Sequence, residues 1–183
     1  EWGERCVEHL IGMFAFALWD PNERSLFLAR DRLGIKPLYY SRTPRAFRFA
    51  SNSQALLAAP DVDTALDPVA LHHQLTLHAV IPAPRTILQG IRKLAPATTL
   101  TIDASGHERS RVYWTLRAMR PATPRDEAEW IEAVHAALRL AVRRRLDIAD
   151  VPVGVLLSGG LDSSLLVALL AETGVRDLRT FSV

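Results

Sequence analysis

The feature that most constrains this chain is the segment VPVGVLLSGGLDSSLLVALLAETG, residues 151–174. Residues 153–157 form a short apolar run with β-branched side chains, which predicts a buried parallel strand. A glycine–serine loop follows directly. The apolar stretch after it predicts a helix that opens at Ser163 and stops at Gly174. The segment therefore predicts a strand, a tight loop and a helix of an α/β domain.

This loop has the composition of a phosphate-binding site. Gly159 and Gly160 let the backbone come close to a ligand. The start of the helix exposes unpaired N–H groups and a partial positive charge, which attract an anion. The hydroxyls of Ser158, Ser163 and Ser164 add donors. No lysine follows the glycines, so the loop does not fit the Walker pattern.

Asp162 is the unexpected residue in this loop, because a carboxylate repels phosphate. Its presence is explained if Mg²⁺ lies between the carboxylate and phosphate oxygens, since Mg²⁺ is usually held by one or two carboxylates and by phosphate. The alternative is an aspartate that caps the helix. The neighbouring serines and glycines favour the metal.

The order S-G-G-x-D-S, between a strand and a helix, resembles the loop of the ATP pyrophosphatase (PP-loop) families. This resemblance implies an enzyme that splits ATP between its α and β phosphates. The alternative is a tight strand-to-helix turn without a ligand.

Composition limits the other classes of function. With 49% hydrophobic and 23% charged residues, the chain is globular rather than disordered. The net charge of +2 does not indicate nucleic-acid binding, and the run Arg143–Arg145 is interpreted as a solvated helix end or an interdomain contact. A single cysteine excludes a disulfide framework and fits a reducing cytoplasm. We find no signal peptide and no apolar run long enough for a membrane. The chain lacks an initiator methionine and stops within a predicted strand, so we expect a fragment.

The first half of the sequence predicts β structure. Turn-forming residues separate strand-like runs, so we expect an antiparallel sheet in a layered domain. The expected strands span residues 12–19, 25–29, 37–40 and 47–50, with a last hairpin at 100–102 and 111–113. Two short helices are expected over residues 54–59 and from Asp67–Pro68 to about residue 77.

The composition changes at a basic, proline-containing linker over residues 117–124, and we place a domain boundary near residue 120. A long helix is predicted to start at Thr123–Pro124. Its apolar residues have helical spacing along one face and are Trp130, Val134, Leu138, Ala141, Val142 and Leu146. Residues 178–183 predict the second strand of a βαβ unit.

A second motif lies upstream. The stretches GMFAFALWD and LFLARDRLGIKPLYY resemble the signature of the glutamine-hydrolysing asparagine synthetases. The pattern R-D-x-x-G-x-K-P-L-Y is carried by Arg30, Asp31, Gly34, Lys36, Pro37, Leu38 and Tyr39. The resemblance covers nearly the whole chain. It implies that residues 1–120 are the C-terminal part of a class II glutamine amidotransferase domain, with antiparallel, Ntn-type layers. It also implies that residues 121–183 begin a Rossmann-like, parallel-sheet ATP pyrophosphatase domain.

This family resemblance implies a ligase that forms an amide in two steps. One domain hydrolyses glutamine to ammonia. The other uses ATP and Mg²⁺ to adenylate a carboxylate, releasing pyrophosphate, and ammonia then displaces AMP. The implied partners are the small molecules glutamine, ATP and aspartate or an acylated dipeptide, without nucleic acid or membrane, and a homodimer is compatible with it.

The same resemblance assigns the site residues. The implied pyrophosphate loop is Ser158, Gly159, Gly160, Leu161, Asp162, Ser163 and Ser164. Asp162 is the implied catalytic residue and magnesium ligand. Leu156 and Val183 match positions that contact the adenosine, although both also suit core packing. Cys6 is not the family's N-terminal nucleophile, and we interpret it as a structural thiol.

Several positions depart from the asparagine synthetase pattern. FASNSQALL carries Asn52 and Gln54 where the family often has glutamate and lysine, and Pro96–Ala97 stands where a P-G dipeptide is common. The segment LDPVALHHQLTLHAVIPAPRTIL resembles the bacterial N-acetylglutaminylglutamine amide synthases, so the acceptor is left open between aspartate and that dipeptide. A non-catalytic relative that binds nucleotide or acts as a scaffold, and a different PP-loop enzyme such as a tRNA-modifying ligase, are the alternatives from other classes.

Overall fold

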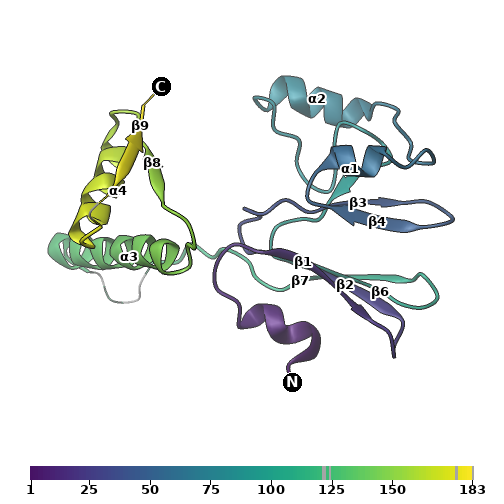
Figure 1. The fold of residues 1–183 in the computed structure, drawn as a ribbon, viewed down its shortest axis with the longest axis horizontal. Helices are drawn as coiled ribbons and strands as arrows, with labels where there is room; N and C mark the ends of the chain where they lie inside the picture. Colours follow the sequence, from purple (N-terminus) through teal and green to yellow (C-terminus); the bar gives the residue numbers. More distant parts are fainter. Residues whose placement is uncertain (121–122, 124, 176, 183) are drawn as a thin grey trace. The chain divides into compact units, whose positions relative to one another are not determined.

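The computed structural model describes residues 1–120, 123, 125–175 and 177–182. The chain divides into two compact units, Glu1–Arg117 (unit 1) and Ala118–Val183 (unit 2), which are described separately (Figure 1).

Unit 1 is built on two antiparallel sheets rather than the one that the sequence predicted. The first has the order β1-β2-β6-β7 and the second the order β4-β3-β5. Their strands are β1 (Ala15–Asp20), β2 (Ser25–Arg30), β3 (Tyr39–Arg42), β4 (Phe47–Ala50), β5 (Arg92–Lys93), β6 (Thr98–Ile102) and β7 (Glu108–Val112).

The three predicted hairpins, β1–β2, β3–β4 and β6–β7, exist, but β3–β4 lies in a different sheet from the other two. The free edge of β2 pairs with β6, so that Leu28 lies opposite Leu100. The free edge of β3 pairs instead with β5, a two-residue strand that the sequence did not predict. Long-range pairing therefore decides which sheet each hairpin joins.

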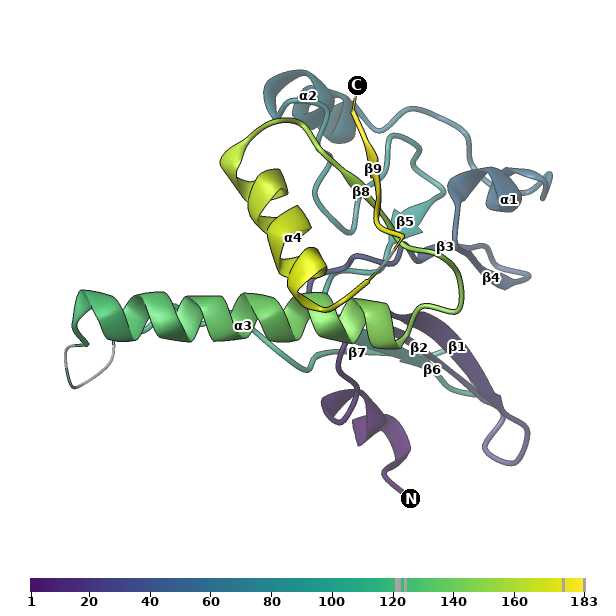
Figure 2. The ribbon, with the colours of Figure 1, turned by 60° about the vertical axis from the view of Figure 1, so that its left-hand side comes forward.

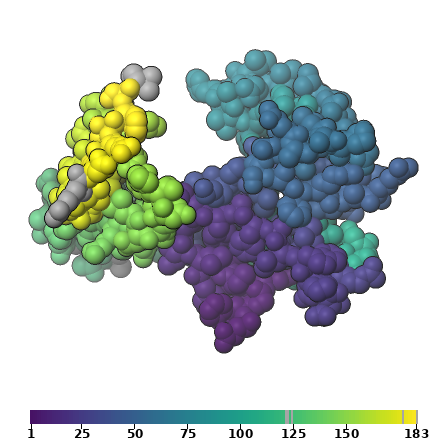
Figure 3. Space-filling view, viewed as in Figure 1, coloured from purple at the N-terminus to yellow at the C-terminus, as the bar shows by residue number. Residues whose placement is uncertain are grey.

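Unit 1 has three apolar clusters, one between the sheets and one on each outer face. The central cluster joins Leu28 and Leu100 of the first sheet to Tyr40 and Phe47 of the second. A 3₁₀ helix, η1 (Gly3–Glu8), places Val7 against the outer face of the first sheet. Two helices, α1 (Ser53–Leu57) and α2 (Pro68–Thr76), lie on the β3–β4 side of the unit (Figure 1), and Leu56 of α1 packs with Ile91. In the space-filling view of Figure 3, the residues from α1 to α2 lie next to one another as one blue-to-teal region of unit 1.

Unit 2 contains α3 (Glu127–Asp147), β8 (Gly154–Leu156), α4 (Leu161–Glu172) and β9 (Arg179–Phe181). β8 and β9 pair in parallel, with α4 as the crossover between them. Figure 2 shows α4 lying across α3. Val142 of α3 and Leu169 and Leu170 of α4 form the core, against which β8 contributes Val155. Among the described residues, no helix combines the length and the apolar character that crossing a membrane requires.

The start of α3 corrects the sequence analysis. The helix begins at Glu127 and not at Thr123–Pro124, and Pro124 lies outside the described residues. Asp126 is the N-cap, and a reciprocal capping box with Glu129 fixes the start: the Glu129 N–H donates to Asp126 at 2.8 Å, and the Asp126 N–H donates to Glu129 at 3.1 Å.

Only part of the predicted apolar stripe of α3 is packed in the core; the rest is exposed. Leu138, Val142 and Leu146 pack in the core of unit 2. Trp130 and Val134, nearer the start of the helix, are 45% and 53% exposed. The helical periodicity was confirmed, but it does not determine which part of the stripe meets a partner.

Candidate functional site

The glycine–serine loop lies between β8 and α4, and its first residue is held by β9. The N–H of Leu157 donates to the carbonyl of Phe181 at 2.8 Å, which extends the parallel pairing up to the loop. A Cβ added to Gly154 would lie 2.7 Å from Cε2 of Phe181, so only glycine admits this ring. The glycine in the apolar strand was the available signal for this contact, because glycine in a strand often marks a close approach.

Inside the loop, Gly159 and Gly160 form an open turn. Gly159 has φ +77°, a left-handed conformation that favours glycine, and an added Cβ would meet nothing within 4 Å. Gly160 is the N-cap of α4, and its carbonyl accepts the N–H of Ser164 at 3.1 Å. The helix therefore starts at Leu161, two residues before the predicted opening at Ser163, because the chain turns into the helix at Gly160.

Two of the three serine hydroxyls of the loop lie close together. Oγ of Ser158 and Oγ of Ser163 lie 3.2 Å apart. The Ser163 hydroxyl also contacts the carbonyl of Gly160 at 3.1 Å. Ser158 and Ser164 are exposed and Ser163 is half-buried, so hydroxyls and the first helical N–H groups share one open surface.

Asp162 lies in the first turn of α4 and is not its cap. The N-cap position belongs to Gly160, and no side chain caps the helix there, so the capping interpretation of Asp162 is wrong. The Asp162 side chain is exposed and forms no hydrogen bond or ion pair with the described residues. Its carboxylate is therefore available to an ion, and its role as a magnesium ligand stays a prediction.

Of the two residues assigned to the adenosine, Leu156 and Val183, only Leu156 lies within the described residues. Leu156 is 75% exposed at the end of β8, so it does not belong to the core of the described chain. It lies opposite Phe181 in the register, so both side chains share the face of the β8–β9 pair away from Val155. Val183 lies outside the described residues.

The upstream motif forms a buried polar hub at the end of β2. The Asp31 side chain is only 1% exposed, and its carboxylate accepts four backbone hydrogen bonds. The donors are the N–H groups of Phe14, Leu33, Ile35 and Lys36, at 3.3, 3.2, 3.0 and 2.9 Å. Burial acts to raise the pKa of Asp31, but these four hydrogen bonds outweigh it and hold the pKa below its ordinary value.

Arg30 completes this hub with backbone carbonyl groups. Its guanidinium donates to the carbonyls of Lys36 at 2.8 Å, Leu94 at 2.6 Å and Gly34 at 2.7 Å. Gly34 has φ +66°, and an added Cβ would lie 2.8 Å from Cγ of Pro96. The motif thus ties β2, the following loop and the segment before β6 together, which explains structurally why these residue types occur at this spacing.

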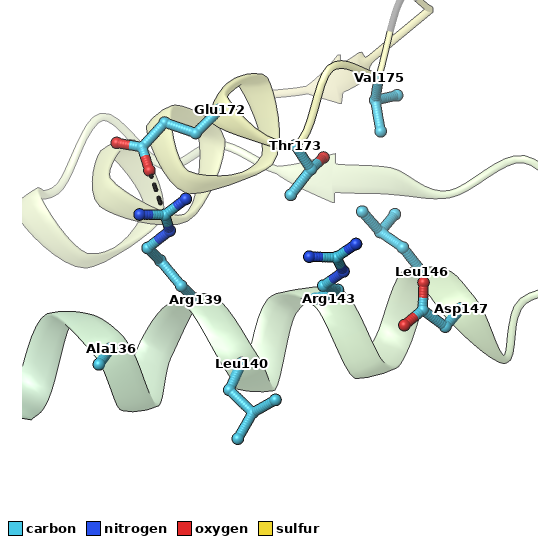
Figure 4. A pocket seen from close by; sticks show the side chains of 9 residues that line it. All are labelled: Ala136, Arg139, Leu140, Arg143, Leu146, Asp147, Glu172, Thr173 and Val175. Atoms are coloured by element: carbon cyan, nitrogen blue, oxygen red, sulfur yellow. Dashed lines mark ion pairs between the residues drawn. The ribbon is translucent and has the colours of Figure 1, made fainter.

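A cavity of about 550 Å³ lies elsewhere in unit 2, between α3 and the C-terminal end of α4 (Figure 4). An ion pair crosses it, with Nε of Arg139 3.4 Å from Oε2 of Glu172. The glycine–serine loop is at the opposite, N-terminal end of α4. This cavity is therefore not the phosphate site that the sequence predicted.

Comparison with known proteins agrees with both parts of the chain. The sequence profile of the family described as "Glutamine amidotransferase domain" matches residues 1–114, and that described as "Asparagine synthase" matches residues 133–183. Unit 1 has the fold of a class II glutamine amidotransferase domain, with antiparallel sheets, and the two helices and two strands described in unit 2 begin a synthase domain.

Two of the relatives are asparagine synthetases, and a third is an amidase. The chain is 38% identical to glutamine-hydrolysing asparagine synthetase 3 of Bacillus subtilis, over 100% of the chain and 30% of that protein. It is 35% identical to asparagine synthetase 1 of the same organism, over 98% of the chain and 28% of that protein. It is also 34% identical to the amidase chyE of Penicillium rubens, over 93% of the chain and 25% of that protein.

Among solved structures, a glutamine phosphoribosylpyrophosphate amidotransferase from B. subtilis aligns with a TM-score of 0.38 and 16% identity, covering 98% of the chain and 34% of that protein.

The chain belongs to the glutamine-hydrolysing asparagine synthetase family. It spans about 30% of the length of the first of these relatives.

Proposed function

We propose that this chain is part of a glutamine- and ATP-dependent ligase of the asparagine synthase type, which converts a carboxylate to an amide. The observation that carries this proposal is the loop Ser158–Ser164, whose open backbone and clustered hydroxyls lie at the start of α4. In this proposal unit 1 belongs to an Ntn-type glutaminase domain, and unit 2 begins a Rossmann-like ATP pyrophosphatase domain.

The residues of the loop suit a nucleotide triphosphate tail. The open space around Gly159 leaves room for phosphate oxygens next to the backbone. The first N–H groups of α4, together with the hydroxyls of Ser158, Ser163 and Ser164, would donate hydrogen bonds to them. Asp162, free of protein partners among the described residues, would hold Mg²⁺.

Chemically, ATP supplies the leaving groups: the acceptor carboxylate takes the adenylyl group as pyrophosphate leaves, and ammonia then takes the acyl group as AMP leaves. This chain's residues would bind and orient the phosphates through hydrogen bonds, and the Mg²⁺ held at Asp162 would offset the negative charge that develops as pyrophosphate leaves. Leu156, exposed at the end of β8, would contact the adenosine, and Val183 is proposed to do the same.

Cys6 has no part in this chemistry. It lies in η1 and packs against the cluster of Val7, Phe27 and Ala29. The glutaminase nucleophile is therefore not assigned to any residue of this chain, and ammonia from glutamine enters the proposal through the family alone.

The test is product analysis with a protein of the relatives' length that contains this chain. Supplied with Mg²⁺, ATP, ammonia and an acceptor, it should release pyrophosphate and AMP, and Asp162→Ala should abolish the release without changing the melting temperature. Asp150→Ala, an exposed aspartate of unit 2 outside the loop, is the matched control and should retain activity. Formation of ADP would refute the proposal. Assays with aspartate beside N-acetylglutaminylglutamine decide the acceptor.

A further inference from the structure

Unit 1 contains a polar cavity that is lined by residues of this unit alone. It measures about 400 Å³ and lies where β3 and β5 meet residues of α1 and α2. Its polar lining residues are Tyr39, Ser53, Gln74, Thr86 and Lys93. Each of these residues is buried or half-buried, and together they line a shallow cavity that is open to solvent on one side.

The sheet register places Lys93 in this cavity. Lys93 of β5 lies directly opposite Tyr39 of β3, so the two side chains share one face of the sheet. The Lys93 N–H donates to the carbonyl of Pro84 at 2.8 Å, which fixes the backbone. The ammonium group contacts the carbonyl of Ile81, another residue of the lining. An ammonium has three N–H donors, so this single contact leaves two without a protein acceptor among the described residues.

The charge around Lys93 is not compensated. Among the described residues, no carboxylate lies within ion-pair distance of Lys93 or of Arg30, the neighbouring cation. Arg30 donates only to backbone carbonyl groups. Burial of Lys93, and to a lesser extent the charge of Arg30, lowers the pKa of Lys93 below its ordinary value. The attraction of an anion bound in the cavity would offset this penalty.

We propose that this cavity binds a small carboxylate with a short aliphatic chain, its carboxylate on the Lys93 ammonium and its chain against Ile81 and Ile87. One ammonium balances one negative charge, whereas phosphate sites usually present several cationic or N–H donors. The hydroxyls of Tyr39 and Ser53 form no side-chain hydrogen bond with another described residue, so they can orient the ligand. The site is independent of the proposed ATP chemistry.

The test uses the chain's two lysines, Lys36 and Lys93, as signal and internal control. The 183-residue chain, labelled with ¹³C- and ¹⁵N-lysine, is titrated with sodium butyrate at constant ionic strength. The Lys93 side-chain resonances should shift with saturation, with a Kd on the order of 1–10 mM. The pKa of Lys93 should rise, since a bound anion favours the charged form. Lys36, which is exposed, should stay unchanged.

Two further arms distinguish the ligand chemistry and the residue. Inorganic phosphate at the same ionic strength should not saturate Lys93; a phosphate response as strong as that of butyrate would overturn the carboxylate assignment. Butyrate should raise the melting temperature of the unaltered chain and of Lys36→Met. It should not raise the melting temperature of Lys93→Met. If Lys93→Met does not fold, the titration of the unaltered chain still decides. Equal, non-saturating shifts of both lysines would overturn the proposal.

Discussion

Replacing Asp31 by asparagine tests the buried hub of the signature motif. The side chain keeps its shape but exchanges one carboxylate oxygen for an NH₂ group. Of the four backbone N–H groups that the carboxylate accepts, two would then face a donor. A hydrogen bond to a charged group contributes about 1.5–3 kcal/mol. Removing the buried charge offsets part of the loss, so we expect Asp31→Asn to lower the free energy of unfolding by about 3 kcal/mol.

The assay is urea unfolding at pH 7, followed by far-UV circular dichroism, with the slope of the transition compared between variants. A loss of about 3 kcal/mol is a large part of the stability of a typical domain, which is about 5–15 kcal/mol. Asp103→Asn is the matched control, because that carboxylate also accepts hydrogen bonds from a turn but is exposed. Its effect should be much smaller. Equal effects of the two substitutions would refute the reasoning.

The pH dependence provides a second readout of Asp31. Its pKa is lower in the folded chain than the ordinary value of 3.8. The stabilisation from the ionised carboxylate is therefore fully present above about pH 4 and is lost as the pH falls through the folded pKa. The stability difference between the unaltered chain and Asp31→Asn should shrink below about pH 4, and a constant difference would contradict this account.

Two further substitutions test local structure. Gly34→Ala should cost about 3 kcal/mol, because backbone strain (about 1–2 kcal/mol) adds to overpacking against Pro96 (about 1–3 kcal/mol). Gly106 is the control, because it also has a positive φ but an added Cβ would meet nothing within 4 Å. Gly106→Ala should therefore cost only the backbone strain. Equal losses of unfolding free energy for the two variants, measured by urea unfolding, would argue against the contact with Pro96. Asp126→Ala removes the capping box of α3 and should lower the free energy of unfolding by about 1 kcal/mol. Thermal unfolding followed by circular dichroism measures this change. An unchanged transition would show that the capping box does not stabilise α3.

Local sequence signals predicted the elements better than their assembly. The hairpins around Asp20–Pro21 and Arg42–Thr43 were predicted because turn-forming residues mark them. Their distribution over two sheets was not, since it depends on partners such as Leu100 and Lys93, far away in the sequence. A strand of two residues such as β5 carries no periodicity by which it could be predicted.

Helix starts were predicted with small errors that have a physical cause. Thr123–Pro124 has the residue types of a helix start, but the reciprocal bonds between Asp126 and Glu129 fix the start of α3 at Glu127. At the loop, Gly160 takes the N-cap position, so α4 starts before the serines.

The candidate site was predicted as a set of residues, and its geometry was not. The motif gave the hydroxyls and Asp162, but the distance between Ser158 and Ser163 and the contact between Gly154 and Phe181 required the structure. The same holds for the hub: the pattern around Asp31 is visible in the sequence, whereas Phe14 as a donor is not, because 17 residues separate the two.

The measurement that tests the central claim most directly is equilibrium binding of ATP, with and without Mg²⁺, to a protein of the relatives' length that contains this chain. We predict that tight binding requires Mg²⁺ and that Asp162→Asn weakens it at least about tenfold, a loss of about 1.4 kcal/mol, while the melting temperature stays the same. Asp150→Asn should bind like the unaltered protein. Affinity that is independent of Mg²⁺, or equal in Asp162→Asn and the unaltered protein, would contradict the assignment of this loop as the nucleotide site.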